Sequence, residues 1–113
     1  MMTLNKNAAA IMTKHGAHAA TDITGFGILG HAQNLAEAQK APVKMVIEKL
    51  PILKNMHAAD KALGGMFKLL DGKSAETSGG LLIAIPKENA PAFVKELKVF
   101  YFCLLTATWL GNQ

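Results

Sequence analysis

One short stretch, residues 19–31, constrains the fold of this chain more than any other. It reads Ala-Ala-Thr-Asp-Ile-Thr-Gly-Phe-Gly-Ile-Leu-Gly-His, so Asp22 stands between the hydroxyls of Thr21 and Thr24, and three glycines follow with the spacing G-x-G-x-x-G. Glycine lets the backbone turn sharply and approach a ligand closely. A helix that begins behind such a turn offers free N–H groups and a positive dipole end, which suit phosphate. The stretch therefore predicts a phosphate or nucleotide site.

Asp22 adds a carboxylate to the predicted phosphate site. A carboxylate repels bare phosphate, so its usual role beside one is to hold Mg²⁺ against the phosphate oxygens. This reasoning predicts Asp22 as a metal ligand. An Asp before Thr-Gly is also common as an Asx-turn or cap residue, so a purely structural role remains an alternative.

The same glycines also match the fingerprint of dinucleotide-binding proteins. Glu48 follows Gly30 at about the distance expected of an acid that binds ribose. The first strand of such a unit is strongly apolar and opens the unit, whereas here the segment before Gly25 carries Thr21 and Asp22 and follows a predicted helix. Binding of NAD(P) therefore ranks third among the possible functions of this chain.

Hydrophobic periodicity predicts helices and strands in alternation along the chain. The expected helices cover residues 3–15, 25–39, 51–63 and 90–98. The expected strands cover residues 17–23, 43–48 and 81–85. The last of these is apolar on both faces, which is typical of a strand that lies centrally in a sheet and is covered on two sides.

Composition excludes several classes of protein. The chain has 113 residues, enough for one domain, and its net charge of +4 comes entirely from lysine, which argues against a nucleic-acid reader. The single Cys103 excludes an internal disulfide and a cysteine-based zinc cluster. The apolar run in residues 99–110 is too short to span a membrane, and no signal peptide is visible, so we expect a cytoplasmic protein.

Residues 20–31 and 76–83 together resemble the two signature stretches of the selenophosphate synthetases (selenide, water dikinases). The separation of the stretches and the intervening Leu50-Pro-Ile-Leu53 fit as well. The resemblance implies an α+β layered domain in which helices cover a mixed β-sheet, as in the C-terminal domain of the aminoimidazole-ribonucleotide-synthetase-like (PurM-like) superfamily. It covers residues 1–98, implying a partial domain that is incomplete at its C-terminal end, and leaves residues 99–113 as an apolar tail of unassigned status.

The resemblance also implies an activity and a site. The family makes selenophosphate, AMP and phosphate from selenide, ATP and water, with Mg²⁺. Asp22 matches the position that helps to hold the Mg²⁺–ATP phosphates in that family. The implied cofactor-binding residues are Thr21, Asp22, Thr24, Gly25, Phe26 and Gly27, with Thr77, Ser78, Gly79 and Gly80 nearby.

The departures from the family pattern set further expectations. The reactive Cys or selenocysteine of the family, its partner Lys and its other metal-binding acids belong to an N-terminal domain outside this sequence. We therefore expect no catalytic residue in this chain and no activity from the chain alone. Glu76 and the sequence of residues 25–29 resemble the animal paralogues that lack the nucleophile more than the members that have it. The alternative is a non-catalytic module that docks with a full-length homologue, which the family implies is a homodimer.

Overall fold

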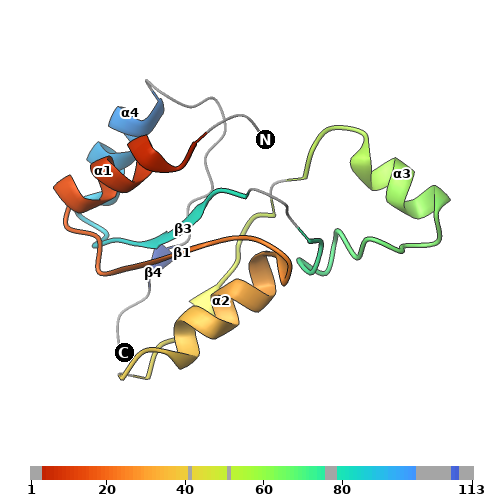
Figure 1. Cartoon of the computed structure of the whole chain (residues 1–113), viewed down its shortest axis with the longest axis horizontal. Helices are drawn as coiled ribbons and strands as arrows, with labels where there is room; N and C mark the ends of the chain where they lie inside the picture. Colours follow the sequence, from red (N-terminus) through yellow and green to blue (C-terminus); the bar gives the residue numbers. More distant parts are fainter. Residues whose placement is uncertain (1–3, 41, 51, 76–78, 99–107, 110–113) are drawn as a thin grey trace.

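The computed structural model describes residues 4–40, 42–50, 52–75, 79–98 and 108–109. Figure 1 shows helices and short strands alternating along this part of the chain. In chain order the elements are α1 (Lys6–Lys14), β1 (Ala19–Asp22), α2 (Gly27–Glu37), β2 (Met45–Val46), α3 (Met56–Ala62), β3 (Leu81–Ala84), α4 (Ala90–Lys98) and β4 (Thr108–Trp109). The mixture confirms the expected α+β class, and both described strand pairs are antiparallel. No helix among the described residues is long and apolar enough to cross a membrane.

The ribbon formed by β1 and β3 is the centre of the fold. The two strands pair with Ala19 opposite Ala84 and Asp22 opposite Leu81. Because successive side chains in a strand point to opposite faces, Leu81 and Ile83 lie on one face and Leu82 on the other. This alternation explains why residues 81–85 are apolar on both faces of the strand. Among the described residues, β1 is the one strand that pairs with β3.

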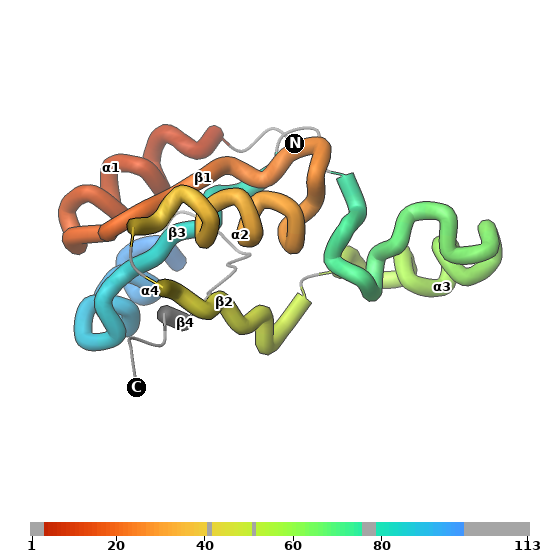
Figure 2. Tube along the Cα trace, turned by 90° about the horizontal axis from the view of Figure 1, so that it is seen from below, coloured from red at the N-terminus to blue at the C-terminus, as the bar shows by residue number. Residues whose placement is uncertain are grey.

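Helices cover both faces of this ribbon, as Figures 1 and 2 show. On one face α1 and α4 enclose a buried cluster that Leu81 and Ile83 join; its members are Ala8, Ile11, Ile85, Phe93 and Leu97. On the other face α2 packs against the strands around Ile23, Ala32, Leu35 and Leu82. Coverage on two sides, expected from the sequence, is thus confirmed for β3.

The first helix ends as its sequence predicts. The N–H of Gly16 donates to the Thr13 carbonyl at 3.2 Å, and the N–H of Ala17 donates to the Met12 carbonyl at 3.0 Å. Gly16 has φ +68°, so this is the left-handed C-terminal stop that glycine favours. The turn reverses the chain and feeds it into β1, which carries the predicted site residues.

Several predicted boundaries were too wide. The helix expected over residues 3–15 covers Lys6–Lys14, and Leu4, expected on its buried face, is 74% exposed. The strand expected over residues 43–48 covers Met45–Val46, which pairs with β4. That partner strand lies within the predicted tail, whose other residues fall outside the described ranges.

The α3 arm (residues 52–71) projects away from the remainder of the described structure (Figures 1 and 2). The helix expected from Pro51 begins later, at Met56, because Asn55 adopts a left-handed φ of 71° before it. The apolar spacing of residues 51–63 suits a helix packed against a core, but the structure leaves most of its large apolar side chains exposed. The exposed large apolar side chains of the arm are Leu53, Met56, Leu63, Met66, Phe67 and Leu70.

Candidate functional site

The end of the β1–β3 ribbon brings the two signature stretches together. Beyond the last strand pair, the Ile23 N–H donates to the Gly80 carbonyl at 3.0 Å and the Gly79 N–H donates to the Ile23 carbonyl at 3.1 Å. These bonds continue the antiparallel ladder past Asp22, so the start of the glycine loop lies beside Gly79–Gly80. Thr77 and Ser78, also predicted for the site, lie outside the described residues.

Strand geometry separates Thr21 from Asp22. Asp22 shares the ribbon face that α1 and α4 cover, whereas Thr21 lies on the face toward α2, because neighbouring strand residues alternate. The Thr21 hydroxyl donates to the main-chain carbonyl of Asp22 at 3.2 Å, not to its carboxylate. The carboxylate of Asp22 is exposed. The structure therefore leaves Asp22 accessible and does not group it with the Thr21 hydroxyl.

Asn5 contributes a side chain from the start of α1 that the sequence analysis missed. Its Nδ2 donates to the Gly79 carbonyl at 3.0 Å instead of capping its own helix. This bond spans most of the chain and attaches the second signature stretch to α1. Nothing in the local sequence distinguishes it from an ordinary cap, because an Asn before a helix normally bonds to that helix.

The turn from Thr24 to Phe26 is attached to α2 by a histidine. His31 is 9% exposed, and its Nε2 accepts a hydrogen bond from the Thr24 N–H at 3.0 Å. The Thr24 hydroxyl lies 3.2 Å from the same nitrogen. The ring of Phe26, which is 69% exposed, contacts the His31 ring with centroids 5.5 Å apart and planes tilted by 49°. The sequence does not predict His31 as a ligand, because no second ligand is spaced to pair with it.

Two of the motif glycines are explained by packing within the protein. Gly27 has φ +68°, and a Cβ there would lie 2.7 Å from the Lys73 carbonyl carbon and 2.8 Å from the Gly72 oxygen. A Cβ on Gly30 would lie 2.6 Å from the Cβ of Phe26. Gly25 has nothing within 4 Å of its Cβ position, so that position alone of the three opens outward.

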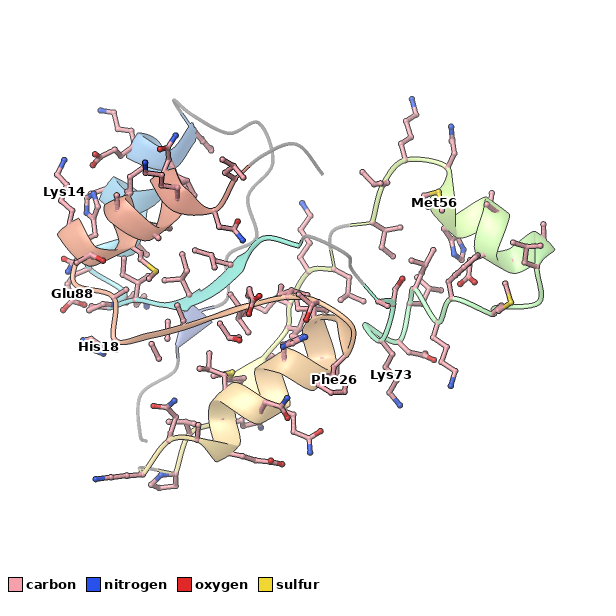
Figure 3. All side chains as sticks on the ribbon, viewed as in Figure 1. Lys14, His18, Phe26, Met56, Lys73 and Glu88 are labelled. Atoms are coloured by element: carbon pink, nitrogen blue, oxygen red, sulfur yellow. The ribbon has the colours of Figure 1, made fainter. Side chains whose placement is uncertain are left out.

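The beginning of α2 is partly occupied by the protein itself. The Leu29 N–H donates to the Gly72 carbonyl at 2.9 Å, and the Gly27 N–H donates to the Thr24 carbonyl at 3.1 Å. Two of the helix's first donors are therefore already bonded within the protein, so this N-terminus offers fewer free N–H groups than expected. Figure 3 shows Phe26 at this end of α2 and Lys73 in the loop that contacts Gly27.

Asp22 is the one acid among the residues predicted for the site. Within the described ranges, no group of three or more His, Cys, Asp or Glu side chains is arranged to hold a metal ion. A Mg²⁺ ion binds readily through one or two carboxylates when phosphate oxygens and water complete its shell. The exposed Asp22 carboxylate therefore fits Mg²⁺ carried by a phosphate ligand better than a self-contained protein metal site.

The strands around the glycine motif do not form a dinucleotide-binding unit. That unit needs two parallel strands of one sheet, joined through the helix that follows the glycines. In the part of the chain that is described, β1 and β2 flank α2 but belong to different sheets. Glu48 is exposed beyond β2. The structure thus gives the NAD(P) alternative no support.

The fold and site define an α+β domain in which two glycine-containing stretches meet at the end of a helix-covered strand pair. The family model described as AIR synthase related protein, C-terminal domain, matches residues 1–101. The chain therefore belongs to this domain family, which confirms the expected PurM-like C-terminal domain.

Relatives of this chain include three selenide, water dikinases from vertebrates. Selenide, water dikinase 3 of Danio rerio is 58% identical over 107 residues, covering 95% of this chain and 24% of that protein. Selenide, water dikinase 2 of Mus musculus is 60% identical over 98 residues, covering 87% of this chain and 22% of that protein. Its human counterpart is 59% identical, with the same coverage. The chain spans about a quarter of the length of the curated relatives it matches.

Proposed function

We propose that this chain supplies one wall of a Mg²⁺–ATP site in a selenophosphate synthetase-like protein, which converts selenide, ATP and water to selenophosphate, AMP and phosphate. The observation that carries the proposal is the pair of hydrogen bonds in which the Ile23 N–H donates to the Gly80 carbonyl and the Gly79 N–H donates to the Ile23 carbonyl, beside an exposed Asp22. Two stretches far apart in the sequence meet where a carboxylate is accessible. The proposal places the reaction in the cytoplasm, with ATP as the small-molecule partner.

Each residue of the proposed wall has a separate role. Asp22 holds the Mg²⁺ that accompanies the ATP phosphates, and Thr24, Gly25 and Phe26 form the adjacent turn. Gly27 anchors that turn against the loop after α3, while Gly79 and Gly80 border the other side. Thr77 and Ser78 stay predicted members of the wall from the family resemblance. When bound, Mg²⁺ supplies charge neutralisation and orientation of the phosphates, which dominate phosphoryl transfer.

A single carboxylate gives weak metal binding, so the proposal assigns the other metal ligands and the reacting groups to the remainder of a longer protein. We expect the chain alone to be inactive. Formation of selenophosphate from selenide and ATP by this chain alone would contradict that expectation. Assembly of the longer protein as a homodimer belongs to the same proposal.

Titration calorimetry of Mg²⁺–ATP into the chain tests the wall. We expect weak binding that requires Mg²⁺ and is lost in Asp22→Asn, because the amide removes the charge that attracts the ion. Glu88→Gln is the matched control, since Glu88 is an exposed acid that lies away from Phe26 in Figure 3, and it should bind as the wild type does. Absence of binding to the folded wild-type chain, or equal binding by Asp22→Asn, contradicts the proposed wall.

The exposed apolar surface of the α3 arm favours one alternative, a non-catalytic module that docks with a full-length homologue. The arm exposes Leu63 (56%), Met66 (65%) and Leu70 (61%). Exposed apolar surface gathered in one segment is typical of an interaction site. Size-exclusion chromatography of the labelled chain with a full-length selenide, water dikinase checks it. Co-elution that is lost in Leu63→Ser but kept in Ala58→Ser, without Mg²⁺–ATP binding by the chain, favours docking.

A further inference from the structure

We propose that His31 is a positioning residue of this wall: a neutral imidazole, protonated on Nδ1, that fixes the Thr24–Phe26 turn in the form that receives the ligand. The inference rests on the proposed function for the ligand and on geometry alone for the histidine. His31 is buried on α2, and it contacts both Thr24 and Phe26. It therefore holds the two ends of the turn whose middle residue, Gly25, opens outward.

The main chain sets the protonation state of the ring. A backbone N–H is always a donor, so the His31 Nε2 that lies 3.0 Å from the Thr24 nitrogen must present a lone pair. An imidazole with an unprotonated Nε2 is neutral and carries its hydrogen on Nδ1. The Thr24 hydroxyl, 3.2 Å from the same nitrogen, can only donate to it. The amide and the hydroxyl of Thr24 therefore share the single lone pair of the His31 Nε2.

The ring of His31 also sets the position of Phe26. The exposed Phe26 ring rests on the imidazole at 5.5 Å between centroids, and its Cβ occupies the space that a side chain on Gly30 would need. The next residue along α2 is the buried Ala32, and Leu35 follows one turn after His31. The histidine therefore connects an otherwise exposed turn to the core behind it, which gives the turn one arrangement before any ligand arrives.

Nuclear magnetic resonance of the wild-type chain tests the tautomer directly. We expect the His31 Nε2 resonance to be that of an unprotonated nitrogen, the proton to be on Nδ1, and a coupling through the hydrogen bond to join Nε2 to the Thr24 amide nitrogen. A ring protonated on Nε2 at neutral pH overturns the proposal, since it could not accept from Thr24. This measurement needs neither a variant nor a ligand.

Two substitutions separate positioning from packing. His31→Leu fills the space without an acceptor, whereas His31→Gln keeps an amide oxygen at about the place of Nε2. We expect hydrogen exchange of the Thr24 amide to be at least about tenfold faster in His31→Leu, equivalent to roughly 1.4 kcal/mol, and close to the wild type in His31→Gln. His18→Gln is the control, because His18 is an exposed histidine before β1.

The ligand readout uses the same set of variants. We expect the Kd for Mg²⁺–ATP to rise at least about tenfold in His31→Leu and to recover in His31→Gln, with His18→Gln unchanged. Loss of affinity that follows the urea midpoint in both His31 variants would mean that the histidine only packs, and would overturn the positioning role. If the wild type binds no Mg²⁺–ATP, the positioning role fails together with the wall, while the tautomer and the Thr24 amide exchange still report separately on the hydrogen bond.

Discussion

Gly27 is the residue at which backbone conformation and packing act together. It begins α2 with φ +68°, and the main chain of residues 72–74 passes within 3 Å of the place where a Cβ would lie. Gly25, two positions earlier in the same motif, has neither a positive φ nor an atom within 4 Å of its Cβ position. The two glycines of one motif therefore have different physical reasons to be glycine.

Substitution of the two glycines by alanine should separate these reasons. Gly27→Ala must adopt a left-handed φ and displace a backbone segment, so we expect a loss of at least about 2 kcal/mol in the free energy of unfolding. Gly25→Ala, whose Cβ meets nothing within 4 Å, should change it by less than about 0.5 kcal/mol. Urea unfolding of both variants measures the difference, and equal effects would mean that the loop after α3 does not pack as described.

The residues of the site show where sequence reasoning stops. The resemblance to one family implied that Gly79 and Gly80 lie near residues 20–31, as the hydrogen bonds of Ile23 show. The role of Asp22 was inferred from its chemistry and stays a prediction. The opposite facing of Thr21 and Asp22 follows from the predicted strand over residues 17–23, because neighbouring strand residues alternate. Which of the two lies toward α2 could not be predicted, because it depends on packing between distant segments. His31 was missed because its partner is a main-chain N–H, and a backbone group leaves no sequence signal.

At the scale of elements, α1 and α4 are joined by a small charged cluster. Glu96 on α4 accepts from Lys14 Nζ at 2.8 Å and lies 2.7 Å from His15 Nε2, both at the end of α1. The His15 ring meets Phe93 edge-on at 5.9 Å between centroids, and the Asn89 side chain donates to the His15 carbonyl at 3.0 Å. The hydrogen bond from Lys14, followed by that from His15, holds the pKa of Glu96 below its ordinary value.

The Glu96 cluster makes the free energy of unfolding depend on pH, and the lowered pKa of Glu96 sets the direction of that dependence. Because the pKa of Glu96 is lower in the folded chain, its contribution is fully present above the ordinary glutamate pKa and is lost as pH falls through the lowered folded value. We expect Glu96→Gln to be less stable than the wild type near neutral pH, with a difference that shrinks on acidification. Glu88→Gln, at an exposed position before α4, is the control. A difference that grows as pH falls would contradict the assignment.

The presence and order of the helices and strands were predicted better than their boundaries. Residues 90–98 form α4 with the expected boundaries, and α1 ends one residue before its predicted end. The start of α3 was misplaced, since the apolar spacing after Pro51 continues a helical pattern through residues that are not helical. A pattern of apolar residues indicates a face only when something covers that face, and the described structure places nothing over the α3 arm.

At the scale of the whole molecule, Leu82 is among the most buried apolar side chains of the described residues. It is 3% exposed and packs with Ile23, Ala32 and Leu35 between the ribbon and α2. We expect Leu82→Ala to lower the free energy of unfolding by about 2–5 kcal/mol, because it leaves a cavity. Leu53→Ala removes the same atoms from a side chain that is 78% exposed, and should change stability by less than about 0.5 kcal/mol. Denaturant unfolding of both variants measures the difference. Similar losses in the free energy of unfolding would contradict the described core.

The α3 arm is closed at its base. The Leu29 N–H bonds to the Gly72 carbonyl, and the Leu50 side chain lies 3.4 Å from the place of a Cβ on Gly72. Beyond this neck, the buried Asp60 carboxylate accepts from the Phe67 and Leu69 N–H groups at 2.8 and 3.3 Å, so the arm has its own internal order.

A segment whose two ends meet behaves as a removable insert. Each halving of a flexible loop recovers only about 0.6 kcal/mol of closure entropy, so exchanging residues 51–71 for a short Gly-Ser linker should leave the ribbon and its two helical layers folded. Amide exchange of β1 and β3 in such a chain checks this, and loss of their protection would contradict it. The chain thus consists of a domain that is interrupted in sequence and an insert, the α3 arm. We expect each of the two to accept substitutions and changes of length without affecting the other.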